Sequence, residues 1–363
     1  MPVRADIAIV SLGTTTGWRV ADRALAEQVT AAGASCVLVP VAIGAAGRLR
    51  RTMALTDIVE ALAARRTAQG ASAGATIFST VTSALLQPLR GPHAIRFDTT
   101  ASLSRPGAGG AWQRRREQEV LARADLLLPM SDPAAAAAEA AVARAVPAGH
   151  RDRPSASAGP RQVVLPSPVE RAREPAPDAP EAIAYAANPD KRGLDLLCRA
   201  WTAAAPSDAR LLVGGIDRGD ALRWLAREGV AEPPAVEWAG AVGRDRWLAL
   251  VAGARVFVNA SRFEDWGLAQ MEALGAGTPL VTVPTPGPNA ALPLARALAA
   301  DLVAPAADPA ALAAALRVGL AMDEHQRAAY ASAAERLLSP YSDEALGAVV
   351  AREVLPALLN RSS

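Results

Sequence analysis

Cysteine and aromatic residues are scarce in this sequence of 363 residues, and neither sign of charge dominates. Only two cysteines occur, Cys36 and Cys198, so no disulfide framework is indicated and both are expected to be buried, reduced thiols. No apolar run reaches the roughly 18 residues that a membrane-spanning helix needs. The formal net charge of +2 provides no basic field for nucleic acid, so no nucleic-acid partner is expected.

Metal ligands and an export signal are lacking as well. His93, His150 and His325 are scattered and have no second ligand at metal spacing, so no metal site is expected. The N-terminus has no signal-peptide cleavage pattern, which favours a cytoplasmic location. What the sequence does have is 51% apolar residues, enough for full cores, and a length that suits two domains.

Strand-like and helix-like segments alternate along the chain, which predicts an α/β fold with parallel sheets. The first expected strand is Ile7–Val10, and it is followed by a glycine- and threonine-rich turn at Gly13–Gly17 and a helix over 18–32. A second series of this kind begins at Ile183 and includes a helix at Leu194–Ala204 and a strand at Leu211–Val213. The prediction is two Rossmann-like domains that face each other across a cleft, with ligand at the carboxyl ends of the strands.

The domain boundary is expected where proline accumulates, between Pro147 and Pro180. Proline cannot continue a regular helix or a central strand, so this zone reads as a connection. Val163–Leu165 is expected to be the last strand before the boundary. The domains are therefore drawn at residues 1–168 and 169–340.

Two glutamates eight positions apart, Glu264 and Glu272, carry the strongest functional signal. An apolar run at 256–258 precedes them and another at 280–283 follows, so the segment reads as strand, turn, short helix, turn, strand. On a helix, eight residues span about 12 Å. The first carboxylate falls at the helix entrance, where backbone N–H groups lack partners, so the pair can hold a long polar ligand with an anionic middle.

This segment resembles the retaining glycosyltransferases of family 4, also called group 1, which have the GT-B fold and use nucleotide sugars as donors. The likeness rests on the E-x7-E element, the E-x-x-G-L core and the G-x-G-T-P exit over 261–279. It implies that Glu264 lies at the donor sugar and that Glu272 holds the ribose hydroxyls. It also implies that residues 1–168 bind the acceptor, that residues 169–340 bind the nucleotide sugar, and that a last helix at about 341–363 crosses back to the first domain.

The family's loop of two cations for the donor diphosphate is only partly present. Arg192 matches the second cation and Lys191 adjoins it, but Ala186 stands at or near the place of the first arginine. Charge builds on the leaving diphosphate during transfer, so Arg192 and Lys191 are expected to share the task. The alternative is that both are solvated loop charges. No Asp-x-Asp occurs, which fits chemistry without a divalent metal.

The remaining site assignments also follow from the resemblance. Asp98 occupies the place of a histidine that contacts the donor sugar in many relatives, and it could equally be a turn or helix-cap residue. Gly17 matches the second glycine of an N-terminal pair whose first member is replaced by Thr16. The residues assigned to donor binding, with Glu272, are Gly17, Gly214, Val242 of the segment that faces the base, and the backbone amides of Trp266, Gly267 and Leu268.

The sequence thus predicts a retaining, metal-independent glycosyltransferase without a cofactor, whose substrate is a nucleoside-diphosphate sugar, with UDP or GDP as the carrier. The acceptor is expected to be a small-molecule or lipid-linked hydroxyl compound, and the oligomeric state is open. The basic triplet Arg114–Arg116 reads as a solvated helix face or as a contact to an anionic acceptor or to the inner face of the membrane. One alternative is a catalytically silent GT-B protein that binds a nucleotide or sugar as a partner or sensor. A solute-binding receptor, a sugar-phosphate synthase and a phosphorylase are the others.

Overall fold

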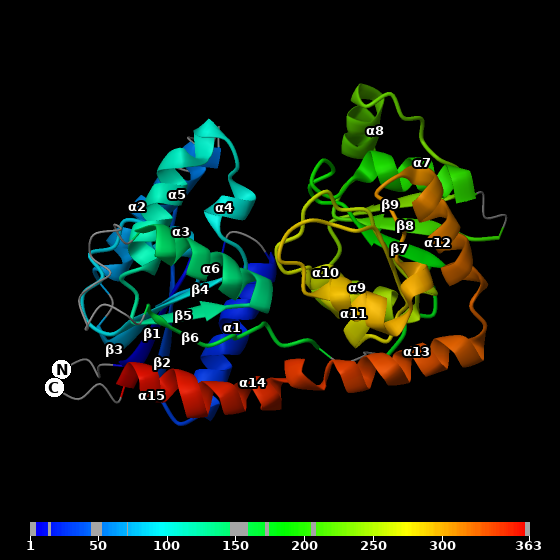
Figure 1. Ribbon diagram of the computed structural model, residues 1–363. Coiled ribbons are helices and arrows are strands. Elements are labelled where there is room, and N and C mark those ends of the chain that lie inside the picture. The colour runs from blue at the N-terminus through cyan, green and yellow to red at the C-terminus, as the bar shows by residue number, and fades with distance from the viewer. Residues whose placement is uncertain are drawn as a thin grey trace. The chain divides into compact units, whose positions relative to one another are not determined.

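A computed structural model describes residues 5–13, 16–44, 53–70, 72–145, 159–170, 174–204 and 208–359 of the chain. The chain divides into two compact units. Unit 1 comprises Met1–Pro168 together with Tyr341–Ser363, and unit 2 comprises Val169–Pro340. Each unit contains a parallel β-sheet with helices packed on it (Figure 1).

Unit 1 is built on a six-stranded sheet in the order β2-β1-β3-β4-β5-β6, and every neighbouring pair is parallel. Parallel neighbours need crossover connections, and helices between the strands supply them. The elements are β1 (Ala5–Ser11), α1 (Thr16–Ala31), β2 (Cys36–Pro40), α2 (Met53–Ala68), β3 (Ala73–Phe78), α3 (Val81–Ala84), β4 (His93–Phe97), α4 (Ala101–Ser104), η2 (Ala108–Gly110), α5 (Ala111–Leu121), β5 (Leu126–Pro129), α6 (Asp132–Ala145) and β6 (Arg161–Gln162).

Side-chain alternation along the strands of unit 1 explains its two cores. Ile7 and Ile9 of β1 belong to one buried cluster, whereas Val10 belongs to another. The same alternation holds in β4, where Ala94 lies in the first cluster and Ile95 in the second. Successive strand residues point to opposite faces, so the sheet is buried on both sides, as a parallel sheet requires.

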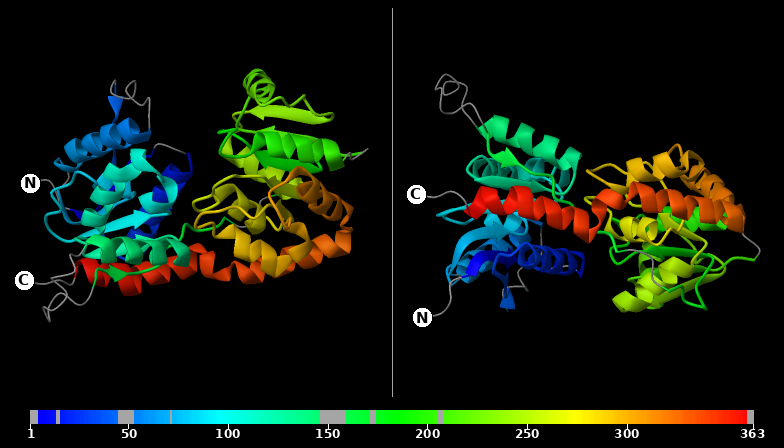
Figure 2. Two further views of the ribbon diagram at one scale, coloured as in Figure 1. Left: turned by 45° about the horizontal axis from the view of Figure 1, so that its top comes forward. Right: turned by 90° about the horizontal axis from the view of Figure 1, so that it is seen from below.

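The C-terminal segment of the chain completes the first of these cores. It consists of η5 (Ser339–Tyr341), α14 (Asp343–Val349), the π-helical turn η6 (Val350–Val354) and α15 (Leu355–Leu359). Leu346, Val350 and Leu358 are buried against Leu25 and Val29 of α1. The last helices therefore lie beside α1 in unit 1 (Figure 2).

Unit 2 contains a five-stranded parallel sheet in the order β11-β10-β7-β8-β9. β7, β10 and β11 are adjacent, so the loops that follow them emerge at the same edge of the sheet. The elements are β7 (Ala182–Tyr185), α7 (Leu194–Ala204), β8 (Leu211–Gly214), α8 (Arg218–Arg227), β9 (Val236–Gly240), α9 (Arg244–Gly253), β10 (Val256–Asn259), α10 (Leu268–Gly275), β11 (Leu280–Thr282), α11 (Ala291–Leu298), η4 (Ala300–Leu302), α12 (Pro309–Ala321) and α13 (Glu324–Leu337).

The expected strand at Val163–Leu165 is wrong in its position, because β6 ends at Gln162. The backbone N–H groups of Val163 and Leu165 still donate to Leu127 and Pro129 of β5, at 3.0 and 2.8 Å. The two cysteines are free thiols, with Cys198 buried and Cys36 partly exposed, and burial raises the pKa of Cys198 to about 12.

Parts of three sequence expectations lie outside the described residues. They are Thr14 and Thr15 of the glycine- and threonine-rich turn, residues 147–158 and 171–173 of the proline-rich zone, and residues 360–363 of the expected last helix.

Candidate functional site

The glutamate segment begins where β10 ends and enters α10 through a glycine. Gly267 is the N-cap residue of α10 and has φ 85° and ψ 43°, in the left-handed region that favours glycine. A Cβ at this position would also lie 2.9 Å from Asn289 Oδ1. The glycine therefore permits both the turn and the close approach of neighbouring side chains to the start of the helix.

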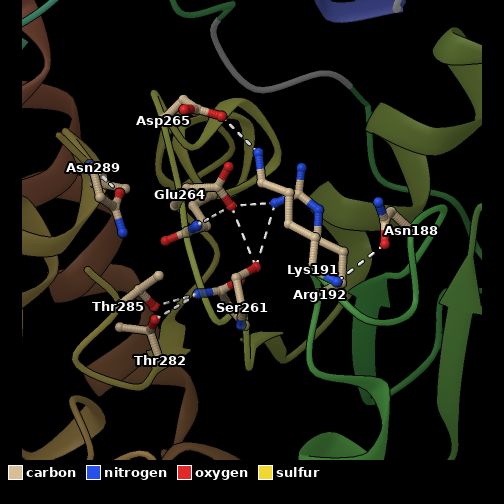
Figure 3. Close-up of polar contacts among 12 residues, drawn as sticks. Asn188, Lys191, Arg192, Ser261, Glu264, Asp265, Thr282, Thr285 and Asn289 are labelled. Carbon is tan, nitrogen blue, oxygen red and sulfur yellow. Dashed lines mark hydrogen bonds and ion pairs between the residues drawn. The ribbon is translucent and has the colours of Figure 1, made fainter. Parts of the chain in front are cut away.

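The Glu264 carboxylate is buried, with 3% of the residue exposed, and its Oε2 has three partners (Figure 3). Arg192 Nη1 forms an ion pair with it. Gln270 Nε2 donates to the same oxygen at 3.1 Å, and Ser261 Oγ lies 3.3 Å from it. A buried charge is stable only when it is paired and hydrogen-bonded, and these contacts meet that condition.

Polar side chains of β10 and β11 hold Ser261 in place. Ser261 Oγ lies 2.7 Å from Asn259 Oδ1, at the end of β10. Asn259 Nδ2 in turn donates to Thr282 Oγ1 of β11 at 3.0 Å. This chain of contacts links two neighbouring strands to the carboxylate and fixes its position.

The loop after β7 brings two cations to the glutamate segment. Lys191 Nζ pairs with Asp265 Oδ2 at 2.6 Å, beside the Arg192–Glu264 pair. A backbone hydrogen bond also joins the two loops, in which Arg262 N donates to Lys191 O at 2.9 Å. Gly193 has φ 60°, and a Cβ there would lie 2.1 Å from Ala260 O, so only glycine allows this approach.

Glu272 lies within α10, eight residues after Glu264, and is also buried, with 6% of the residue exposed. Arg244 Nη1 lies 2.6 Å from Glu272 Oε1, and Trp247 Nε1 donates to Oε2 at 3.2 Å. Burial raises the pKa of Glu272, and the Arg244 guanidinium beside it opposes that rise. Arg244 also pairs with Glu170 at 2.6 Å. The two glutamates of the motif are thus both buried and both paired with arginine.

Gly214 and Val242 lie near this second carboxylate in the fold. Gly214 ends β8, and a Cβ on it would lie 2.6 Å from Trp247 Cζ3, so the glycine makes room for the indole that contacts Glu272. Val242 lies between β9 and α9, two residues before Arg244. Trp266 is buried and its carbonyl oxygen accepts from Ala290 N at 3.3 Å, which ties the start of α10 to the segment after β11.

Asp98 and Gly17, the two predicted residues of the first domain, lie in unit 1. Asp98 follows β4 at the carboxyl end of the strand, and Gly17 is the second residue of α1. Asp98 acts on the buried Arg96, whose pKa is lowered by burial against the pull of Asp22 and Asp98. The structure brings the other predicted residues together in unit 2.

The basic triplet of α5 is engaged in contacts within unit 1. Arg115 and Arg116 pair with Glu119 at 3.5 and 2.6 Å. Arg114 donates to the carbonyl oxygen of Gly107 at 2.8 Å. Only Arg115 is exposed as a solvated face requires, because Arg114 and Arg116 are partly buried and Arg116 Nε also donates to Leu85 O at 2.6 Å.

Sequence reasoning missed four polar residues of the site: Arg244, Trp247, Gln270 and Asn289. Arg244 is the first residue of α9 and directly follows residues 238–243, the segment of Val242 that is expected to face the base. Its place as the first cation after that segment was a sequence signal that could have identified it. Gln270 lies within the glutamate motif but at a position that the motif leaves open. No helix among the described residues is long and apolar enough to cross a membrane, and no three potential metal ligands gather in the same part of the chain.

Comparisons with known proteins agree with this geometry. Residues 180–339 match the family model described as glycosyl transferases group 1. No curated protein matches the sequence. Among solved structures, the chain is similar to sucrose-phosphate synthase from Thermosynechococcus elongatus, with 18% identity and a TM-score of 0.73 over 99% of this chain and 100% of the other.

Two further structures have the same fold. The Anabaena protein HepE in complex with UDP-glucose has 14% identity and a TM-score of 0.68 over 96% and 98% of the two chains. The α,α-trehalose-phosphate synthase (UDP-forming) from Burkholderia xenovorans, in complex with glucose-6-phosphate, has 13% identity and a TM-score of 0.66 over 97% and 99%. The chain therefore has the GT-B fold of two Rossmann-like domains. Within it, residues 180–339 match the group 1 glycosyltransferases.

Proposed function

We propose that this protein is a retaining, metal-independent glycosyltransferase that moves a sugar from a nucleoside-diphosphate sugar to the hydroxyl group of a small-molecule or lipid-linked acceptor. One observation carries the proposal. Glu264 and Glu272 are both buried on a single segment of a group 1 domain, and each is paired with an arginine, Arg192 or Arg244. Buried, paired carboxylates at fixed spacing are suited to hold the two ends of one ligand.

The donor diphosphate is assigned to the space beside Lys191 and Arg192. Both cations lie beside the loop that leads into α10, so two positive side chains and the N-terminus of this helix are assigned to one anion, with the backbone N–H groups of Trp266, Gly267 and Leu268 as its expected contacts. These groups can stabilise the charge that develops on the leaving diphosphate without a divalent ion. Arginine is also suited to bidentate contact with phosphate oxygens.

Glu272 is assigned to the ribose and Glu264 to the donor sugar. In the transfer step, the bond between the anomeric carbon and the diphosphate oxygen breaks while a bond to the acceptor oxygen forms on the same face. The acceptor proton goes to an oxygen of the leaving diphosphate. Unit 1 is assigned to the acceptor, and the resemblance gives Asp98 and Gly17 of this unit a part in donor binding. The Anabaena relative is described with UDP-glucose, which supports UDP as the first carrier to test and GDP as the second.

Thermal unfolding in the presence of UDP, GDP, ADP and TDP, each with and without magnesium, tests the proposal. One nucleotide should stabilise the wild type without metal and should fail to stabilise the Glu272→Ala variant. If none of the four nucleotides raises the melting temperature, the assignment of the donor site is wrong. The anomeric configuration of the product, read by NMR, then decides between retention and inversion.

The catalytically silent alternative has one observation in its favour. Ala186, at the place of the family's first diphosphate cation, is a buried residue with 1% exposure, so nothing at this position can contact a phosphate by charge. Release of free nucleotide from a nucleotide sugar by the wild type, absent in a Glu264→Gln variant, would eliminate this alternative. Stabilisation by a nucleotide without any turnover would favour it.

A further inference from the structure

Two buried polar atoms beside Glu264 have no hydrogen-bond partner within the part of the chain that the structure describes. They are Gln270 Oε1 and Asn289 Nδ2. The residues are 1% and 5% exposed. Leaving such a group unpaired costs about 1–3 kcal/mol, so two of them next to one carboxylate require an explanation.

In each side-chain amide, the hydrogen bond made by one polar atom identifies the other as the atom without a partner. Gln270 Nε2 donates to Glu264 Oε2 at 3.1 Å, and a carboxylate oxygen accepts hydrogen bonds only, so the amide nitrogen must face Glu264 and Oε1 must face away. Asn289 Oδ1 accepts from Ala291 N at 3.1 Å, so its Nδ2 is the remaining donor. The orientation of both amides is therefore set by their own partners.

The two side chains meet Glu264 at the start of α10. A Cβ on Gly267 would lie 2.9 Å from Asn289 Oδ1, 3.4 Å from Gln270 Nε2 and 3.4 Å from Glu264 Cγ. In Figure 3, Asn289 lies on the side of Glu264 opposite Arg192. The side-chain amides of both residues and the Glu264 side chain thus gather around one glycine, and each amide carries one of the two unpartnered atoms.

We propose that Gln270 and Asn289 are specificity-determining residues that bind ring hydroxyls of the donor sugar held by Glu264. This inference rests on the proposed function. A sugar hydroxyl is both a donor and an acceptor, so one hydroxyl or a neighbouring pair satisfies Gln270 Oε1 and Asn289 Nδ2 together. A diphosphate cannot do this, because its oxygens only accept. If these buried amide groups need a hydroxyl group as their hydrogen-bond partner, the site rejects a sugar that lacks this hydroxyl group.

Binding measurements test this without knowledge of the acceptor. Calorimetry would give the affinity of the wild type for UDP, UDP-glucose, UDP-3-deoxyglucose and UDP-4-deoxyglucose. The variants are Asn289→Asp, which keeps the oxygen that accepts from Ala291, and Gln270→Met, which keeps the side-chain length. Gln326→Met is the matched control, since Gln326 is exposed on α13 of the same unit. Melting curves report whether each variant folds, and two independent variants keep the test decisive if one does not.

We expect the wild type and Gln326→Met to bind at least one deoxy sugar about tenfold or more weakly than UDP-glucose. In Asn289→Asp and Gln270→Met this penalty should fall below about threefold, while the affinity for UDP alone stays within about threefold of the wild type. If both folded variants keep the full deoxy penalty, the inference is wrong and the proposed function still stands. If the wild type binds neither UDP nor UDP-glucose, the UDP-sugar assignment and this inference fail together.

Discussion

Arg192 and Glu264 form an ion pair between two loops that lie 72 positions apart in the sequence. The loops follow β7 and β10, which are neighbours in the sheet. Glu264 is almost completely buried, whereas about a fifth of the Arg192 side chain is exposed at 21%. The arginine therefore both neutralises the carboxylate and keeps one side available to an incoming anion. In the proposed reaction, the same guanidinium would pair with the carboxylate in the free protein and bind the diphosphate in the complex.

Removal of the arginine should cost both stability and donor affinity. An Arg192→Ala variant leaves the Glu264 charge buried without its cation, which should lower the free energy of unfolding by roughly 3 kcal/mol. The double variant Arg192→Ala/Glu264→Gln should recover most of that loss, because a carboxamide needs no cation. Chemical denaturation of the wild type, Arg192→Ala, Glu264→Gln and the double variant measures the coupling. A double variant no more stable than Arg192→Ala would show that the pair does not act as a unit.

Gly193 should be essential to the cation loop for a steric reason. A Gly193→Ala variant would place a Cβ 2.1 Å from Ala260 O, in addition to the strain of φ 60°. We expect a loss of stability and a nucleotide affinity reduced at least tenfold, since the loop that carries Lys191 and Arg192 must shift. Gly229→Ala is the matched control, because Gly229 has φ 64° but no atom within 4 Å of a Cβ. That variant should lose only about 1 kcal/mol and bind nucleotide normally. Equal effects of the two substitutions would contradict the steric argument.

The sequence predicted the elements of unit 2 well because their signals are local. The run Leu211–Val213 and the helix Leu194–Ala204 both occur where their apolar patterns place them. Lys191, Arg192 and Glu264 were each recognised from motifs, but their mutual pairing depends on which strands are neighbours, and the motifs do not encode that. Val163–Leu165 shows a different error, since two of its backbone N–H groups do donate to β5 but the strand itself is only Arg161–Gln162.

Gln270 and Asn289 could not be assigned from the sequence for a related reason, and the only sequence signal for Arg244 was its place directly after the segment of Val242. Each is an ordinary helix or loop residue by its local pattern, and only packing shows that it faces a buried carboxylate or Gly267. Arg244 contacts Glu272 from 28 positions away. A partner of this kind follows from the tertiary fold rather than from spacing along the chain.

Lys191 is the only lysine in the sequence, which makes it a selective chemical probe of the proposed phosphate site. About a third of its side chain is exposed, at 33%, and it pairs with Asp265. Acetylation with a lysine-directed reagent should remove the charge and weaken nucleotide binding about tenfold. The nucleotide itself should protect the residue, as read by mass spectrometry of the peptide that contains it. A Lys191→Arg variant should be insensitive to the reagent. Acetylation at the same rate with and without saturating nucleotide would argue against phosphate contact at this side chain.

The buried Glu117 of α5 should make the stability of unit 1 depend on pH. Its carboxylate is buried, and burial raises its pKa from 4.5 to about 8, although both oxygens accept from Ala101 N at 2.8 and 2.9 Å. A raised pKa in the folded state means that the folded protein holds this proton more tightly than the unfolded chain. The associated stability is therefore fully present below about pH 4.5 and is lost as the pH rises through about 8.

A Glu117→Gln variant, which stays neutral at every pH, should not show this loss. The difference in melting temperature between the wild type and Glu117→Gln should move in favour of the variant between pH 5 and about pH 8. Glu119→Gln is the control on the same helix, since Glu119 lies in exposed pairs with Arg115 and Arg116 and its burial is much smaller. Parallel profiles of the wild type and Glu117→Gln over this range would mean that the two hydrogen bonds from Ala101, which favour the charged carboxylate, outweigh the cost of its burial.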